Sequence, residues 1–405
     1  MNARTIVAAT ALALVAVACG GASESPQTQT PDSVAAPTSP GDNSTASPGS
    51  GELPVGPSAL DNMTDPELPT PLIDPEEIIS GGPPPDGIPS IDEPEFVSIE
   101  AADEWLSDAE PVIYLEQGGE VHAYPVQILI WHEIVNDTVG GVPVTVSYCP
   151  LCNSAVSYLR VIDDVETTFG TSGRLFASAL VMYDRATESL WTHFDGRAVA
   201  GLLTGRQLDP ISSPLLAWSE FKTAFPDGVV LDRDSTGASR PYGENPYAGY
   251  DNPETAPFLF RGTVDERAKA KQRVVGVAVD GAAAAWTLET ISGSEAQATN
   301  AKVGDTPIVI LWKAGQVTAL ETARIVSGRD VGSVGVFSPT VDGDTLTFTS
   351  EGDGFVDEAT NSRWDVTGTA VSGPLAGTRL DQIHHLDTFW FSWSTYQPGT
   401  ELIDS

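Results

Sequence analysis

The sequence predicts a β-rich α+β fold with few helices, built as a two-lobed domain from an internal duplication with pseudo-two-fold symmetry. The first observation behind this prediction is that the chain after residue 110 consists mostly of short alternating apolar and polar runs separated by glycine turns. The second is that two distant segments of this part match each other. Hydrophobic residues make up 41% of the chain, which is enough to form a core.

Residues 1–18 have the pattern of an export signal. Arg4 gives a basic start, and residues 6–18 form an apolar run of 13 residues, too short to span a bilayer comfortably. The small residues before Cys19 resemble the lipobox of bacterial lipoproteins, which implies cleavage before Cys19 and acyl chains on this residue. The alternative is an ordinary signal peptide with an incidental cysteine. We expect an extracytoplasmic protein whose lipid anchor at Cys19 holds it on the outer face of the cell membrane.

Residues 19–92 are rich in Ser, Thr, Pro, Gly and acidic residues. Such a composition buries too little apolar surface to offset the entropy of ordering, so we predict a disordered acidic tether. The whole chain has 20 Lys and Arg against 56 Asp and Glu, a net charge of −36. This charge argues against nucleic acid as a partner, because binding phosphates requires clustered cations. The sequence predicts no particular protein partner.

The internal match joins residues 184–211 to residues 357–383. With one single-residue gap, 14 of 24 compared positions are identical. Weaker similarity extends in both directions, so we place repeat A at 110–232 and repeat B at 272–403, joined by a polar connector at 233–271.

Residues kept in both copies are predicted to be structural. These are Asp184 with Asp357 and Trp191 with Trp364. The repeated glycines are predicted to mark turns that need a positive φ, and they are Gly201 with Gly373 and Gly205 with Gly377.

Repeat A contains two motifs that repeat B lacks, and this difference locates the candidate site. The first runs Trp-His-Glu-Ile-Val-Asn-Asp over residues 131–137. It falls in a segment, 125–136, whose apolar residues surround the axis and predict a buried helix that ends at the following Gly-Gly pair. His132 lies three residues from apolar neighbours on either side, so we expect it to face the interior. There it is either a ligand or a core histidine bonded to the backbone.

The second motif is Cys149-Pro150-Leu151-Cys152, between two predicted strands. As a metal knuckle, Cys149 and Cys152 with His132 supply three soft or borderline ligands. Such a set suits copper(I), or zinc with one open position. Glu133 and Asn136 are the candidate orienting neighbours. His193, whose counterpart in repeat B is Asp365 or Val366, is a candidate fourth ligand.

Two other chemistries stay open for this cysteine pair. One is thiol–disulfide exchange, although such a motif opens a helix and residues 155–159 favour a strand. The other is a structural disulfide in a non-enzymatic binding or scaffold lipoprotein. The common hydrolase, zinc-protease and nucleotide-binding motifs are absent from the sequence, so it does not decide whether the chain is an enzyme.

Taken together, these motifs resemble the bacterial and archaeal family called domain of unknown function 3179. The resemblance is carried by AYPVQILIWHEIVNDTVGGVPVTVSYCPLCNSAV, TFGTSGRLFASALVMYDRATESLWTHFDGRAVAG and GPLAGTRLDQIHHLDTFWFSWSTYQPGTEL. It implies an exported, often lipid-anchored protein and no assigned reaction. Asn153 stands where the family pattern implies glycine, and asparagine also tolerates left-handed geometry.

Overall fold

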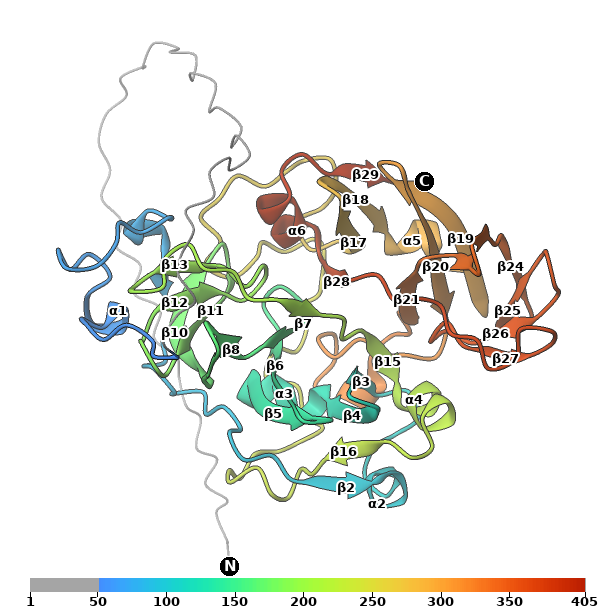
Figure 1. Cartoon of the computed structure of the whole chain (residues 1–405), viewed down its shortest axis with the longest axis horizontal. Coiled ribbons are helices and arrows are strands. Elements are labelled where there is room, and N and C mark those ends of the chain that lie inside the picture. The colour runs from blue at the N-terminus through green and yellow to red at the C-terminus, as the bar shows by residue number, and fades with distance from the viewer. Residues whose placement is uncertain (1–50, 405) are drawn as a thin grey trace, which may run out of the picture. The chain divides into compact units, whose positions relative to one another are not determined.

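The computed structural model of the chain describes residues 51–404 (Figure 1). The predicted signal peptide at 1–18, the lipidation site Cys19 and the tether up to residue 50 lie outside the described residues. Between residues 51 and 404, no helix is long and apolar enough to cross a membrane.

The prediction of a β-rich α+β fold with few helices is confirmed. Before repeat A lie α1 (Ala59–Asn62), the 3-10 helix η1 (Pro75–Glu77), β1 (Ile79–Ser80), β2 (Phe96–Ser98) and α2 (Ile99–Asp103). Repeat A contains β3 (Pro111–Gln117), β4 (Glu120–Pro125), α3 (Val126–His132), β5 (Ile134–Val139), β6 (Val142–Cys149), β7 (Ser154–Leu159), β8 (Val161–Ile162), β9 (Val165–Glu166), β10 (Phe169–Phe176), β11 (Ala179–Asp184), β12 (Leu190–Thr192), β13 (Ala198–Ala200), β14 (Pro210–Ile211), β15 (Leu215–Ala217), α4 (Trp218–Ala224) and β16 (Val229–Leu231).

Repeat B follows the connector, which contains no helix or strand. Its elements are β17 (Arg273–Val279), β18 (Ala282–Thr287), α5 (Leu288–Ile291), β19 (Ala296–Val303), β20 (Thr306–Lys313), η2 (Ile325–Ser327), β21 (Ser333–Phe337), β22 (Thr340–Val341), β23 (Asp344–Thr345), β24 (Phe348–Glu351), β25 (Gly354–Asp357), β26 (Arg363–Trp364), β27 (Ala370–Ser372), β28 (His385–Phe389), α6 (Trp390–Tyr396) and β29 (Glu401–Ile403).

Three sheets of repeat A share their strand order with three sheets of repeat B. The pairs are β15-β3-β4-β16 with β28-β17-β18-β29, β5-β6-β7 with β19-β20-β21, and β10-β11-β12-β13 with β24-β25-β26-β27. In the first pair, both hairpins have one antiparallel and one parallel outer neighbour. The two halves therefore have a common topology, while the duplication as their origin stays a prediction.

The repeated aspartates organise the same turn in both halves. The carboxylate of Asp184 accepts hydrogen bonds from the backbone N–H three residues on, at 2.6 Å, and from the indole of Trp191, at 2.9 Å. Asp357 accepts the equivalent bonds at 2.6 Å and, from Trp364, at 3.0 Å. A buried carboxylate is stable only when such donors surround it. These residues are structural in both halves, as predicted.

The glycines after these turns also correspond. Gly201 has a φ of +107° and Gly373 a φ of +97°. A Cβ on either would lie 2.6 Å from a backbone Cα, that of Ser189 in repeat A and of Ser362 in repeat B. Both positions therefore require glycine, for the backbone conformation and for the close approach of the neighbouring strand.

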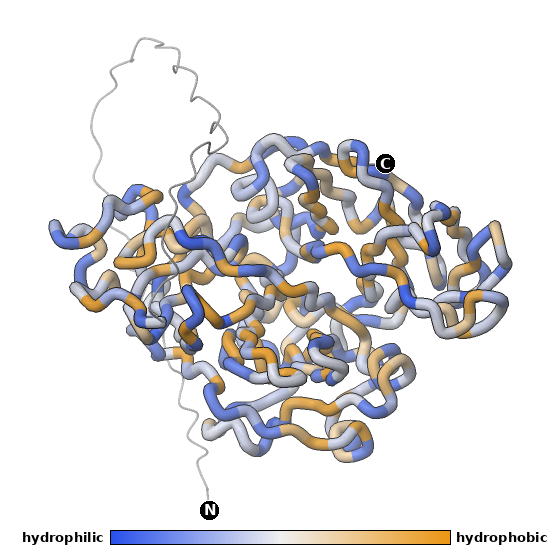
Figure 2. Tube along the Cα trace, viewed as in Figure 1, coloured by the Kyte–Doolittle hydropathy of each residue, from blue (hydrophilic) through white to orange (hydrophobic). Residues whose placement is uncertain are grey.

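The largest hydrophobic core takes side chains from both halves. Tyr148 and Trp191 of repeat A belong to the same cluster as Phe389 and Trp390 of repeat B. Figure 2 shows hydrophobic segments, in orange, alternating with hydrophilic ones along the chain. The predicted cysteine motif is part of this shared core, so both halves contribute to its environment.

The prediction of one helix over residues 125–136 is wrong in its second half. Helix α3 ends at His132, because Glu133 adopts a φ of +59° and the chain continues as strand β5. The following residues include Ile134, Val135 and Val139, whose branched side chains favour a strand over a helix. The Gly-Gly pair that was expected to end the helix forms the turn between β5 and β6 instead.

The prediction of a disordered tether is wrong for residues 51–92. Ala59, Met63, Leu68 and Ile78 pack with buried residues of β11, β12 and β13. A few apolar side chains are sufficient here because they cover a sheet that is already formed, so the segment needs no core of its own.

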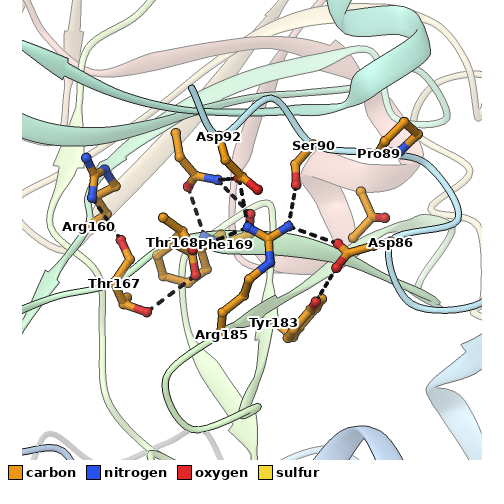
Figure 3. Close-up of polar contacts among 12 residues, drawn as sticks. Asp86, Pro89, Ser90, Asp92, Arg160, Thr167, Thr168, Phe169, Tyr183 and Arg185 are labelled. Carbon is orange, nitrogen blue, oxygen red and sulfur yellow. Dashed lines mark hydrogen bonds and ion pairs between the residues drawn. The ribbon is translucent and has the colours of Figure 1, made fainter. Parts of the chain in front are cut away.

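Residues 81–92, which we call the strap, lie across repeat A and are fastened by Arg185 (Figure 3). The Arg185 guanidinium donates to Asp92 at 2.7 Å, to Ser90 at 2.7 Å and to Asp86 at 3.2 Å. Backbone hydrogen bonds between Ile91 and β5 add to this attachment. The acidic side chains of the strap, whose abundance predicts disorder, therefore order it by pairing with the Arg185 guanidinium.

Candidate metal centre

The two cysteines lie at a tight turn between strands β6 and β7. Cys149 is the last residue of β6 and pairs with Ser154, so four residues, 150–153, make the turn. Asn153 adopts a φ of +51°, the left-handed geometry that was expected of it. Both cysteines are buried free thiols. The turn is a β-hairpin knuckle and not the start of a helix.

Repeat B supports this turn from outside. The backbone N–H of Phe389 and the hydroxyl of Thr388 both donate to the carbonyl of Cys152, at 3.0 and 2.7 Å. Strand β28 of repeat B therefore fixes the backbone of the motif that repeat A carries.

His193 joins the two cysteines from the segment after β12. Its ring nitrogen and the two sulfurs lie within 4.8 Å of one another, and the histidine is 0% exposed. Neither ring nitrogen makes a hydrogen bond of good geometry with the described residues, although the backbone of Ser147 lies near enough to oppose, in part, the lowering of the pKa of the ring by burial. An imidazole buried without partners is costly. A bound ion would supply the missing partner for one nitrogen.

The backbone and a neighbouring hydroxyl hydrogen-bond to the two sulfurs. The N–H of Leu180 donates to Cys149 Sγ at 3.4 Å, and Ser154 Oγ lies 2.9 Å from Cys152 Sγ. Burial, with a further contribution from the neighbouring Cys152 thiol, raises the pKa of Cys149 well above its usual value. Burial also lowers the pKa of His193. Without an ion, both groups are therefore favoured in their neutral forms.

The structure places His132 outside this group, contrary to its prediction as the third ligand, and brings His193 beside the two cysteines instead. His132 Nδ1 donates to the carbonyl of Pro89 at 2.8 Å, and the hydroxyl of Tyr242 donates to Nε2 at 2.7 Å. Burial lowers the pKa of His132, which fits this neutral tautomer. Both nitrogens are thus occupied, and the ring joins the strap to the connector.

Asn136 does not orient the cluster either. Its side-chain amide makes two hydrogen bonds with the backbone of Phe169, accepting from the N–H at 2.9 Å and donating to the carbonyl at 2.8 Å. Asn300 makes the same two bonds with Phe348 in repeat B. Asn136 is therefore structural, and it links β5 to β10.

Glu133 is the predicted neighbour that does lie beside the cluster. Its side chain is 7% exposed. Burial raises the pKa of Glu133 to about 8, and the nearby Cys149 adds to the shift. Its carboxyl group faces a cavity and does not join the three ligand atoms.

A comparison of the sequence with models of protein families identifies the relatives of this chain. Residues 85–400 match the family described as "Protein of unknown function (DUF3179)". The chain belongs to the DUF3179 family. The resemblance found in the sequence motifs is confirmed. Comparison with curated proteins and with solved structures found no match.

In this DUF3179 chain the site is confined to one half. The two halves can be aligned position by position. The hairpins β5–β6 and β19–β20 pair in the same register, and the backbone hydrogen bonds of the residues that follow Trp191 match those of the residues that follow Trp364. Repeat B accordingly has Lys313 for Cys149, Val366 for His193 and Gln297 for Glu133, and the four-residue turn is replaced by a longer loop over 314–332.

Sequence reasoning on this DUF3179 chain gave His193 too little weight and missed the tyrosines of the connector. The available signal for His193 was its presence in repeat A alone, next to a tryptophan that both copies keep. Tyr242, Tyr247 and Tyr250 lie in a segment without regular structure and gave no periodic pattern. Tyr242, for example, is placed by its hydrogen bond with His132, 110 positions earlier in the chain.

Proposed function

We propose that this protein is a lipid-anchored, extracytoplasmic metal-binding protein that holds one copper(I) or zinc ion through Cys149, Cys152 and His193. The observation that carries the proposal is the buried His193 ring, whose two nitrogens lack partners beside two free thiols. Thiolates and imidazoles are the ligands that both ions prefer.

The burial and protonation of Cys149 favour metal binding over thiol–disulfide exchange. An exchange cysteine needs an accessible, low-pKa thiolate, which positive charge or a helix N-terminus provides. Here Cys149 is buried, and burial raises its pKa. A metal ion can stabilise the thiolate directly, whereas an external disulfide must first reach it.

The number of ligands favours copper(I). Among the described residues, no fourth His, Cys, Asp or Glu joins the three ligand atoms. Copper(I) is a soft ion that three such ligands suit, while zinc would need a fourth from water or a bound molecule.

The test uses the full chain carrying Cys19→Ser, so that only the buried pair contributes thiols. The protein is loaded anaerobically with copper(I) or zinc, and bound metal and free thiols are counted before and after chelation. We expect one ion per chain, with both thiols released by the chelator. Cys149→Ser and Cys152→Ser should lose the ion, while His385→Ala, a buried histidine that bonds the Ile383 carbonyl, should keep it.

Two results would reject the metal proposal. Two free thiols without bound metal, in protein loaded with either ion, would favour exchange chemistry. Neither metal nor free thiols in anaerobically purified protein would favour a structural disulfide.

The lipid anchor is tested separately, by cell fractionation. We expect the chain with Cys19 to sediment with the membrane and to incorporate a labelled fatty acid, and Cys19→Ser to do neither. Unchanged sedimentation and labelling of Cys19→Ser would contradict the anchor.

A further inference from the structure

A cavity of about 300 Å³, open to solvent on one side, adjoins the Cys-Cys-His group and is lined by three parts of the chain. The strap contributes Pro83 and Ile88, and the connector contributes Tyr247, Tyr250 and Phe258. Repeat A contributes Leu151, Leu175 and Leu180. The walls are thus mainly aliphatic and aromatic, which is typical of sites for small molecules.

One acidic side chain, Glu133, lies among these walls. It is 7% exposed, and its carboxyl group makes no hydrogen bond or ion pair with the described residues. The other charged wall residue, Arg174, donates to the carbonyl of Leu60 at 2.9 Å instead. A carboxyl group that is buried without a partner costs folding free energy, so its presence in an apolar cavity points to a ligand that satisfies it.

The backbone presents Glu133 to the cavity at a further cost. Its φ of +59° is a conformation that residues with a side chain rarely adopt, and it occurs between the end of α3 and the start of β5. Strain of this kind persists where the surrounding structure over-determines it, and it is common at ligand sites.

We propose that this cavity binds a compact, mainly apolar amine, whose ammonium group pairs with Glu133 and whose body packs against Leu180 and the connector tyrosines. In the empty cavity burial raises the pKa of Glu133 to about 8 and favours its protonated form. A nearby ammonium group stabilises the ionised carboxylate, which accepts hydrogen bonds only, so a cationic donor is its natural partner. Aromatic faces also attract cations, and Tyr247 lies in the same wall. The Tyr250 ring already has the Lys271 ammonium 4.3 Å from its centroid, so it contributes apolar packing. The cavity size limits the ligand to a small body.

The walls are held in place before any ligand arrives. Arg185 fastens the strap, and His132 bonds both the strap, through Pro89, and the connector, through Tyr242. A preformed cavity binds with a lower ordering cost than one that must assemble.

This pocket is separate from the metal site, although they share a wall. Leu180 lines the cavity with its side chain, and its N–H bonds Cys149 Sγ. The amine proposal does not need the metal, because Glu133 and the tyrosines alone supply the recognition. A bound ion and a bound amine would nevertheless be close neighbours.

The experiment measures binding by calorimetry to the full chain with Cys19→Ser, at neutral pH and without metal. The probes are two amines, benzylamine and n-butylamine, and their neutral counterparts, benzyl alcohol and 1-butanol. We expect at least one amine to bind about tenfold or more tightly than its alcohol, as one charge-assisted hydrogen bond would give. Glu133→Gln should remove this preference.

Two variants control the test. Glu110→Gln removes another buried acid, whose carboxylate is already bonded by Gln127, and it should leave amine binding unchanged. Cys149→Ser should bind amine and no metal, which separates failure of this proposal from failure of the metal proposal. Thermal melts check that each variant is folded.

Three outcomes would overturn the proposal. They are no binding of either amine, equal binding of amine and alcohol, or an amine preference that survives in folded Glu133→Gln. Binding of the alcohols alone would assign the cavity to neutral ligands.

Discussion

Repeats A and B have the same strand order in three sheets, the same aspartate–tryptophan turn and the same asparagine contacts with a neighbouring strand. Among the described residues, however, only repeat A has the buried Cys-Cys-His group that we propose as a metal site. At the site the halves differ in Cys149 against Lys313, His193 against Val366, Glu133 against Gln297, and in the longer loop over 314–332 of repeat B. The comparison teaches that the shared contacts build the scaffold and that the chemistry depends on what differs.

Repeat B supports the site that it lacks. Lys313, at the place of Cys149, is used in an ion pair with Glu220 at 3.0 Å. Strand β28 of repeat B contributes the two donors that hold the Cys152 carbonyl. One half therefore acts as the site and the other as its support.

The largest effect should come from removing the shared aspartates. Asp184→Ala and Asp357→Ala each leave several buried donors without an acceptor, so we expect a loss of about 3–5 kcal/mol of unfolding free energy in both. Only Asp184→Ala should also weaken metal binding. The hydrogen bond between Asp184 and Trp191 positions strand β12, and His193 directly follows this strand. Chemical denaturation and metal titration measure the two effects. Equal loss of metal affinity in both variants would refute the division between site and support.

Glu133→Gln, which gives repeat A the residue of repeat B, should stabilise the fold. The folded-state pKa of Glu133 is about 8, above its usual 4.5, so the protonated form is favoured in the folded protein. That contribution is full below pH 4.5 and is lost as the pH rises through 8. Relative to the Gln variant, the metal-free wild type should therefore lose on the order of 3 kcal/mol between about pH 5 and pH 8. Denaturation curves at the two pH values measure this, and a difference independent of pH would contradict it.

The turn glycines should behave alike in both halves. Gly201→Ala and Gly373→Ala each place a Cβ 2.6 Å from a backbone Cα at a positive φ. We expect each to cost about 2 kcal/mol, seen as similar shifts in the denaturation midpoint. A cost in one half only would mean that the two turns are not equivalent.

The last prediction concerns the pH dependence of metal affinity, which repeat A alone should show. Burial raises the pKa of Cys149 and lowers the pKa of His193, so the ion displaces at least one thiol proton and none from the ring near neutral pH. Affinity should rise by about tenfold or more per pH unit between about pH 6 and pH 8. Competition titrations with a chelator of known affinity measure this. A flat profile would show that the thiolates are already formed.

The sequence predicted the parts of the molecule whose signal is local. Strand alternation and the repeated turn gave the β-rich class, and the cysteine motif gave two of the three residues in the metal-binding group. The third, His193, was predicted only as a fourth ligand, and His132 was preferred to it. Residues 125–136 have apolar side chains on all sides, which suits a helix as well as a helix followed by a strand. That ambiguity made His132 an apparent partner of the cysteines, whereas only the fold shows that His193 reaches them.

The central claim is that Cys149, Cys152 and His193 bind one ion and that His132 does not. X-ray absorption spectroscopy of the metal-loaded full chain with Cys19→Ser tests it most directly. We predict two sulfur ligands at about 2.3 Å and one imidazole nitrogen at about 2.0 Å. His193→Ala should lose the imidazole signal or the ion itself, and His132→Ala should keep the complete set. An imidazole signal that survives in His193→Ala and disappears in His132→Ala would contradict the account.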